Sequence, residues 1–206
     1  FAASSIPLVT LGTFLLWFGW FGFNGFSQLA MGTFDDVNAI SKIAVNTHLA
    51  GAAGTVTGAA LTRLFGGKTD IVMMLNGALA GLVAITAEPL TPGPITAMLI
   101  GSIGAVIMYY GTKMLENFGL DDVVGAIPVH MFAGIFGTLV VPFTNGDTNF
   151  GTQFIGMLSV VAFSFVLSYL AFIAIKATVG LRISKEAEKL GTDKAEVGVT
   201  AYSIRD

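Results

Sequence analysis

Six long apolar stretches, separated by short polar or turn-forming segments, dominate this sequence of 206 residues. A helix needs roughly 20 apolar residues to cross a bilayer, and most of the stretches are about that long or longer. They are apolar all round instead of alternating, which favours helices over the strands of a membrane barrel. The sequence therefore predicts an all-α integral membrane protein, a multi-helix transmembrane bundle. Its predicted helices span residues 7–32, 37–65, 71–87, 94–115, 123–143 and 153–179.

Composition supports a membrane protein and excludes several other classes. Charged residues make up 11% of the chain and mean hydropathy is +0.79, whereas a soluble domain carries about 25% charged residues. The net charge of −3 argues against nucleic acid as a partner, and the lack of cysteine excludes disulfides and thiolate metal sites. We expect a transmembrane domain over residues 1–180 and a polar tail over 181–206. Because the chain starts at Phe1 without a signal-peptide pattern, we also expect a piece of a longer polypeptide.

Basic residues predict the orientation of the helices, because lysine and arginine concentrate on the cytoplasmic side of a membrane protein. Nine of them lie at the second, fourth and last connections, and only Lys42 lies at the opposite helix ends. The loops 66–70 and 116–122 and the C-terminal tail are therefore predicted to be cytoplasmic. The nine residues are Arg63, Lys68, Lys113, Lys176, Arg182, Lys185, Lys189, Lys194 and Arg205.

Two histidines, His48 and His130, lie inside the apolar stretches, while the other charges lie at their ends or beyond. A titratable group at membrane depth is costly, so each is a candidate site residue. The alternative is a histidine that only forms a hydrogen bond to a neighbouring helix. The same packing role is expected of two glycine pairs and three asparagines: Gly54–Gly58, Gly77–Gly81, Asn24, Asn46 and Asn76.

Two segments, residues 17–27 and residues 121–130, stand out by their residue types. Residues 17–27 alternate large rings with glycines, which alone is typical of an aromatic belt at a membrane interface. Asp121 and Asp122 precede the fifth predicted helix, where carboxylates interact favourably with the positive end of the helix dipole. Pro128 then interrupts the backbone hydrogen bonding just before His130.

Together these segments resemble the ammonium transporter family (Amt/Mep, related to the Rh proteins). The matching pieces are WFGWFGFN at 17–24, NGALAGLVAIT at 76–86, DDVVGAIPVH at 121–130 and GIFGTL at 134–139. The resemblance covers essentially the whole chain. It implies a trimer of subunits with eleven transmembrane helices, in which two five-helix halves form an inverted repeat around a pore in each subunit. The six predicted helices would be the last six, so a missing N-terminal half would be needed to close the pore.

The resemblance also assigns site residues. His130 matches the second histidine of a pore-lining pair, Phe23 the lower ring of a phenylalanine gate, and Trp20 a pore-lining indole. Ser27 matches the hydroxyl of the outer recruitment site, and Asp122 a helix-start cap. His48 matches no pore histidine of the family, so a structural hydrogen bond is expected there. Phe26 departs from the family, which usually has a small residue at its position.

The expected function is passage of ammonia through a dry pore. Moving an ammonium-sized ion into a low dielectric costs on the order of 20 kcal/mol, whereas neutral ammonia loses roughly 2–7 kcal/mol of hydrogen bonding. A neutral imidazole at His130 would offer ammonia one donor and one acceptor. The sequence has no TVGYG filter of a potassium channel. No cofactor, metal site or enzyme activity is expected, because no nucleophile–base pair or ligand cluster is visible.

The alternatives are an ammonium sensor that signals through its tail, and a fragment with no activity of its own. The tail, residues 181–206, resembles the family's cytoplasmic region, which couples subunits and receives PII-type regulators. Thr192 and Val197 stand where the family commonly has leucine and histidine, which weakens the expectation of PII binding. The other interpretation of the tail is a solvated, disordered segment.

Overall fold

The protein is described by a computed structural model that covers residues 5–201, and within that range every regular element is helical. The chain divides into two compact units, residues 1–157 and 158–206, each of which is described by itself. This division falls inside a helix. The predicted boundary after residue 180 separates apolar from polar sequence, whereas the division after residue 157 separates groups of residues that contact one another. The predicted boundary stays a prediction.

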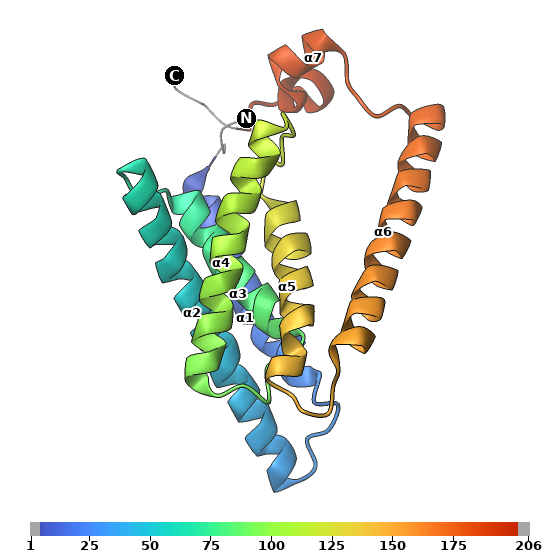
Figure 1. The fold of residues 1–206 in the computed structure, drawn as a ribbon. Helices are drawn as coiled ribbons and strands as arrows, with labels where there is room; N and C mark the ends of the chain where they lie inside the picture. Colours follow the sequence, from blue (N-terminus) through green and yellow to red (C-terminus); the bar gives the residue numbers. More distant parts are fainter. Residues whose placement is uncertain (1–4, 202–206) are drawn as a thin grey trace. The chain divides into compact units, whose positions relative to one another are not determined.

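The first unit contains four long helices and a composite fifth one (Figure 1). The long helices are α1 (Ile6–Phe26), α2 (Phe34–Gly66), α3 (Ile71–Thr86) and α4 (Pro94–Asn117). The composite helix consists of a π-helix η1 (Ile127–Phe132), α5 (Ala133–Val140) and a 3₁₀ turn η2 (Val141–Phe143). A sixth long helix, α6 (Phe150–Thr178), crosses the boundary between the units. The prediction of an all-helical chain is confirmed.

Helix α1 ends six residues before the predicted end at residue 32, because the chain turns after Phe26. Backbone hydrogen bonds tighten to the i→i+3 type there, from Ser27 to Asn24 and from Leu29 to Phe26. Leu29 then adopts a φ of 60°, in the left-handed region that ends helices. The apolar residues after Phe26 thus belong to a loop, and the prediction was wrong for them.

Side-chain caps explain where α2 and α3 begin. Thr33 and Asp36 form a capping box, in which the Thr33 hydroxyl accepts from the Asp36 N–H at 3.2 Å and the Asp36 carboxylate accepts from the Thr33 N–H at 3.0 Å. α2 therefore starts three residues before its predicted start. The Asp70 carboxylate accepts from the Met73 N–H at 3.0 Å and fixes the start of α3. Gly67, with a φ of 75°, ends α2.

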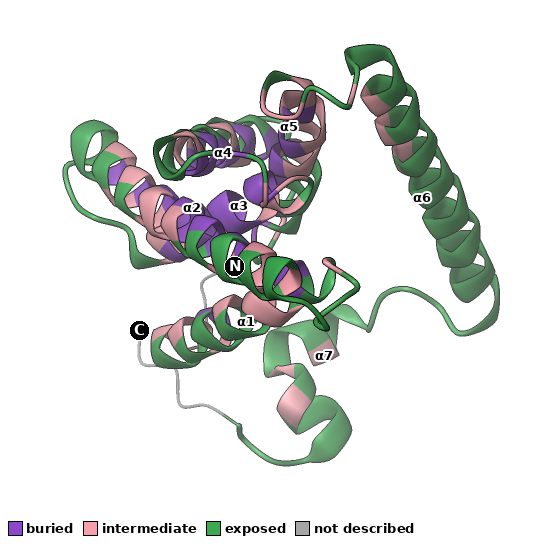
Figure 2. Ribbon diagram, turned by 90° about the horizontal axis from the view of Figure 1, so that it is seen from below, coloured by how far each residue is buried: buried purple, intermediate pink, exposed green. Residues whose placement is uncertain are grey.

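Helix α3 is the centre of the first unit and contacts α1, α2, α4, α5 and η1. Ten of its sixteen residues are buried, nearly all of them apolar or glycine. The buried residues of the unit gather on α3 and on the sides of α2 and α4 that face it (Figure 2). With 16 residues, α3 is about 24 Å long, less than the roughly 30 Å of bilayer hydrocarbon. By length and composition alone, three described helices qualify as membrane-crossing: α1, α4 and α6.

Glycines allow α2 and α3 to approach backbone to backbone. A Cβ added to Gly54 would meet the Gly77 carbonyl, and one added to Gly77 would meet the Gly54 carbonyl. Side chains are thus excluded from both faces of this crossing. The expectation of close packing from the two glycine pairs is met at Gly54 and Gly77.

The three asparagines connect elements, as predicted. Asn24 Nδ2 donates to the Thr47 hydroxyl at 3.0 Å and joins α1 to α2. Asn46 Nδ2 donates to the carbonyls of Pro89 and Pro92 at 2.9 and 2.8 Å, so that α2 holds the loop after α3. These bonds pair amide N–H groups that would be costly to leave unpaired in an apolar bundle, whereas the buried Oδ1 atoms of Asn24 and Asn46 have no hydrogen-bond partner among the described residues.

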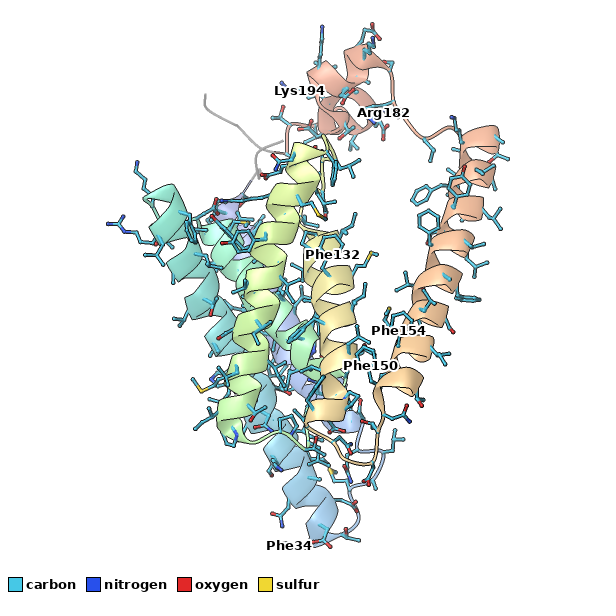
Figure 3. All side chains as sticks on the ribbon, viewed as in Figure 1. Phe34, Phe132, Phe150, Phe154, Arg182 and Lys194 are labelled. Carbon is cyan, nitrogen blue, oxygen red and sulfur yellow. The ribbon has the colours of Figure 1, made fainter. Side chains whose placement is uncertain are left out.

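The second unit contains the rest of α6 and two short helical turns, α7 (Lys185–Leu190) and η3 (Asp193–Val197). The Asp193 carboxylate accepts from the Ala201 N–H at 2.9 Å. This hydrogen bond is the main reason that the pKa of Asp193 lies below its ordinary value. Arg182 and Lys194 are labelled in Figure 3, and Arg182 pairs with Glu188 at 3.9 Å. The described part of the tail thus contains two short helical turns, and whether the tail is a solvated, disordered segment stays a prediction.

Candidate functional site

Phe23, Trp20 and His130 form a row of three rings, which we call the ring row. The centroids of Phe23 and Trp20 are 6.0 Å apart, and those of Trp20 and His130 are 6.4 Å apart. The indole and imidazole planes differ by only 9°, so the two rings are parallel. Phe23 is 65% exposed, Trp20 is half-buried and His130 is exposed. The three predicted pore residues are thus brought together on an open surface of the first unit.

Thr86 fixes the indole of Trp20. Trp20 Nε1 donates to the Thr86 hydroxyl at 2.7 Å, and that hydroxyl donates to the Leu82 carbonyl at 2.7 Å. Because both bonds are short, the indole is held against the end of α3 and its ring face is oriented toward His130. Sequence reasoning missed Thr86. Its signal was the one hydroxyl of α3, at the end of a helix whose only other polar side chain is Asn76.

The backbone around His130 is a π-helix, not the α-helix that was predicted from residue 123. Val123 and Val124 lie in a turn, and the helical segment starts only at Ile127. Pro128 lies in the first turn of this segment, where its missing N–H costs no hydrogen bond, and the Val129 N–H still donates to the Gly125 carbonyl at 3.1 Å. π-Helical turns are rare in proteins, and those that occur are often found at functional sites. They place a side chain where a regular helix would not.

Asp122 and Asn76 hold this segment from two sides. The Asp122 carboxylate accepts from the N–H groups of Ala126 and Ile127 at 2.9 and 2.7 Å. Asn76 Nδ2 on α3 donates to the Val124 carbonyl at 3.1 Å. Between them Gly125 has a φ of 70°, and a Cβ there would lie 2.6 Å from Asn76 Nδ2. The Asp122 carboxylate therefore accepts from two N–H groups at the start of the helical segment, and its role as a helix cap stays a prediction.

Replacing Asp122 by alanine is expected to lower the free energy of unfolding by about 1 kcal/mol, the usual effect of losing a helix-start cap. Two backbone N–H groups lose their acceptor, and the helix start loses a favourable charge. The measurement is thermal unfolding of the full-length protein in detergent. Asp147→Ala is the matched control, because it removes the same charge in the loop after η2 from a carboxylate with no hydrogen bond among the described residues. Equal losses in both variants would contradict the cap role.

Phe132 secures the other end of the π-helix. It is labelled in Figure 3, and its ring occupies the space beside Gly111 of α4, where an added Cβ would lie 2.5 Å from Phe132 Cδ2. This packing joins η1 to α4, and η1 also contacts α3. His130 is therefore positioned by anchors before and after it, not by its own side chain.

Ser27 and Phe26 lie at the end of α1, beyond Phe23. The Ser27 hydroxyl donates to the Phe23 carbonyl at 2.9 Å, which leaves its oxygen free to accept from a ligand. Phe26 is 78% exposed, and its ring lies alongside Gly22, within 3.5 Å of a Cβ placed there. Ser27 follows the ring row along the same helix, while Phe26 turns back along α1.

His48 is separate from the ring row. Its ring contacts Trp17, with centroids 5.5 Å apart, and Phe21, with centroids 6.2 Å apart. Its side chain is exposed, and within residues 5–201 its imidazole makes no hydrogen bond. The expectation of a structural hydrogen bond is therefore not met in the described part of the chain. Aromatic packing between α1 and α2 takes its place.

The ring row combines the properties needed to handle a small cation and its neutral base. Indole and phenyl faces attract cations, by roughly 0.5–2 kcal/mol each. The imidazole offers hydrogen bonds, and Trp20 packs against a buried apolar cluster of the first unit. In the described part of the chain no group of three or more histidine, aspartate or glutamate residues could hold a metal ion.

Comparison with known proteins agrees with these features. The profile of the Ammonium Transporter Family matches residues 1–202. Ammonium transporter Amt2 of Archaeoglobus fulgidus is 41% identical over 96% of this chain and 46% of its own length. Putative ammonium transporter sll1017 of Synechocystis is 37% identical over 95% of this chain and 45% of its own length.

Solved structures give the same result. A structure described as Sensor Amt Protein superposes with a TM-score of 0.84 and 34% identity, over 93% of this chain and 49% of that one. Candida albicans Mep2 superposes with a TM-score of 0.78 and 27% identity, over 92% of this chain and 45% of that one. The chain spans about half the length of the relatives it matches, and corresponds to roughly their C-terminal half. This multi-helix membrane chain belongs to the ammonium transporter family.

Proposed function

We propose that the full-length protein transports ammonium across the cell membrane and passes it through an apolar pore as neutral ammonia. The ring row carries this proposal, because it sets two cation-attracting rings in line with an imidazole. Several relatives are named ammonium transporters, which supports ammonium as the substrate. Methylammonium, which also carries a removable proton, is expected to be a second substrate.

In this proposal each residue has one role. Ser27 accepts a hydrogen bond from ammonium at the outer end of α1, and the rings of Phe23 and Trp20 attract its charge. The ion passes a proton to water on the outer side of Phe23 and continues as neutral ammonia, because crossing a dry pore as an ion would cost on the order of 20 kcal/mol. His130 then exchanges hydrogen bonds with ammonia. Sodium and potassium have no proton to give up and are excluded.

The other wall of the pore would come from the remaining half of the same polypeptide. The ring row lies on an open surface of the first unit, and in inverted-repeat transporters the site lies between the repeats. That half would supply the other pore histidine, and three full-length subunits would form a homotrimer with a pore in each. The distribution of basic residues supports a cytoplasmic C-terminus in a cell (inner) membrane.

A second candidate function is ammonium sensing through the tail. The structure described as Sensor Amt Protein favours it, because it superposes on this chain with a TM-score of 0.84. A tail that signals or binds a PII-type regulator needs a defined shape, and the Asp193–Ala201 hydrogen bond is consistent with one. Val197, where the family commonly has histidine, is 74% exposed on η3 and would lie within reach of such a partner.

Uptake of radiolabelled methylammonium by proteoliposomes that contain the full-length protein tests the proposal. The expected result is saturable accumulation, which ammonium inhibits and potassium does not. A pure sensor would bind ammonium and move none. Potassium conduction as fast as methylammonium uptake would contradict a pore that selects for loss of a proton.

A further inference from the structure

The carboxylate of Glu88, two residues after the end of α3, has no role in the transport steps proposed above. It is half-buried, and in the described part of the chain it forms no ion pair. Its Oε1 accepts from the N–H groups of Leu90 and Thr91, each at 3.1 Å, and its Oε2 accepts from Asn145 Nδ2 at 2.8 Å. The last of these donors lies 57 residues further along the chain.

The hydrogen bond between Glu88 and Asn145, which we call the outer clasp, connects two helices. Glu88 lies two residues after Thr86, whose hydroxyl accepts from Trp20 Nε1. The Asn145 N–H donates to the first carbonyl of η2 at 2.9 Å, so Asn145 continues the last turn of the composite helix. The outer clasp therefore joins the end of α3, which holds the indole, to the end of the helix that carries His130.

The other end of the composite helix is also joined to α3. Just before η1, the Val124 carbonyl accepts from Asn76 Nδ2 at 3.1 Å. Between the two connections α3 and α5 touch through small residues, since a Cβ added to Gly137 would meet the Ala84 carbonyl. Apolar packing of this kind is non-directional, whereas hydrogen bonds are directional. The two end connections therefore fix the rotation of the composite helix on α3.

This rotation matters because the composite helix contains a π-helix. The Ala133 N–H donates to the Pro128 carbonyl, five residues earlier, where an α-helix would use the carbonyl four residues earlier. Return to an α-helix would shift the register by one residue, which corresponds to a turn of about 100°. The helix before this step would then turn relative to the helix after it. A connection at one end alone would permit that turn, and connections at both ends oppose it.

The ring pair of Trp20 and His130 depends on this register. The two rings are parallel within 9° at a centroid distance of 6.4 Å. A side chain reaches about 5–6 Å from the helix axis, so a rotation of only about 10° moves its tip by about 1 Å. A misplacement of about 1 Å can slow a reaction by about a hundredfold. We expect passage along the ring row to be similarly sensitive.

We propose that Glu88 is a positioning residue for transport. Through the outer clasp it keeps the composite helix in its π-helical register on α3, and so holds the imidazole of His130 parallel to the indole of Trp20. Both oxygens of its side chain must accept, one from backbone N–H groups and the other from Asn145, which explains a carboxylate at this position. This role rests on the proposed transport function.

The test is methylammonium uptake by proteoliposomes that contain equal amounts of folded full-length protein. E88Q keeps the length of the side chain and the oxygen that accepts from the two backbone N–H groups, but it sets an NH₂ group against the NH₂ group of Asn145. The maximum rate is expected to fall about tenfold. KM should change less than about twofold, because Ser27 and Phe23 lie on α1 and are not held by the outer clasp.

Exchange of donor and acceptor gives a sharper test. N145D sets two carboxylates against each other and should lower the maximum rate as E88Q does. In E88Q/N145D the new amide donates to the new carboxylate, and position 145 still accepts from the Asp147 N–H, as Asn145 Oδ1 does at 3.0 Å. The rate should then return to within about twofold of the unmodified protein. D147N is the matched control, because it removes one negative charge near the outer clasp and leaves the clasp intact.

Three results would overturn the role of Glu88: an unmodified rate in E88Q, an equal loss in D147N, and a double variant no faster than E88Q. If E88Q does not fold, N145A decides the matter, because it removes the clasp without opposing two like groups. Its control is N149A, since Asn149 Oδ1 accepts from the Thr152 N–H at 2.9 Å, at the start of α6. N145A should be about tenfold slower than N149A, and equal rates would contradict the proposal.

The unmodified protein separates this proposal from the proposed function. If it takes up no methylammonium, the transport proposal fails and the role of Glu88 fails with it. If it takes up methylammonium and all variants match it, only the role of Glu88 fails.

Discussion

Replacing His130 by alanine in the full-length protein is expected to lower methylammonium uptake by about tenfold to a hundredfold. Ammonia inside an apolar pore has few hydrogen-bond partners, and an unmet hydrogen bond costs about 1–3 kcal/mol. Each 1.4 kcal/mol added to the barrier slows passage tenfold. The measurement is the initial rate of uptake into proteoliposomes with equal amounts of folded protein.

His48→Ala is the matched control for this experiment. It removes an imidazole from α2 instead of η1. The His48 ring contacts Trp17 and Phe21 and is not part of the ring row. We expect uptake within about twofold of the unmodified protein, since a weak aromatic contact is worth roughly 1 kcal/mol or less. Unchanged uptake in His130→Ala would refute the role of His130. An equal loss in both variants would point to a general defect.

Replacing Gly54 by alanine is expected to destabilise the full-length protein by about 3 kcal/mol or more. Overpacking usually costs 1–3 kcal/mol when side chains can adjust. Here the added Cβ would meet the Gly77 carbonyl and lie 3.2 Å from the Gly81 Cα, so backbone atoms would have to move. The separation of α2 from α3, at the centre of the unit, would increase. Thermal unfolding and the yield of folded protein in size-exclusion chromatography measure the effect.

Gly12→Ala in α1 makes the same chemical change in open space, because no atom lies within 4 Å of an added Cβ. Alanine favours a helix over glycine by roughly 1 kcal/mol, so this control should be as stable as the unmodified protein or slightly more stable. A Gly54→Ala variant that unfolds at the same temperature as Gly12→Ala would show that the α2–α3 crossing can relax.

The helical architecture was predictable because bilayer thickness and apolar runs constrain it strongly. Asn24 and Asn46 were predictable as connections for the same reason, since polar amides in an apolar bundle need partners. The end of α1 could not be predicted from the sequence. Leu29 and Met31 are apolar and lengthen the run, whereas the left-handed turn at Leu29 depends on local backbone geometry that hydropathy does not report.

The candidate site was predictable in its residues but not in its support. The resemblance to the family predicted Phe23, Trp20 and His130 as site residues. It did not predict Thr86, whose hydroxyl fixes the indole of Trp20. Pro128 signalled an irregular backbone before His130, yet a π-helix and an α-helix fit the same letters. The contacts of His48 depend on how α1 crosses α2, which is a tertiary property that no local pattern carries.

The π-helix before α5 makes the length of this segment as important as its composition. Each residue of an α-helix turns the chain by about 100°, so one residue removed between Gly125 and His130 would rotate the imidazole away from Trp20 while every nearby side chain stayed the same. Insertions and deletions here should therefore abolish activity even when point substitutions are tolerated. The loop residues 146–149, after η2, do not set the rotation of a ring-row side chain, so insertions and deletions there should be tolerated better.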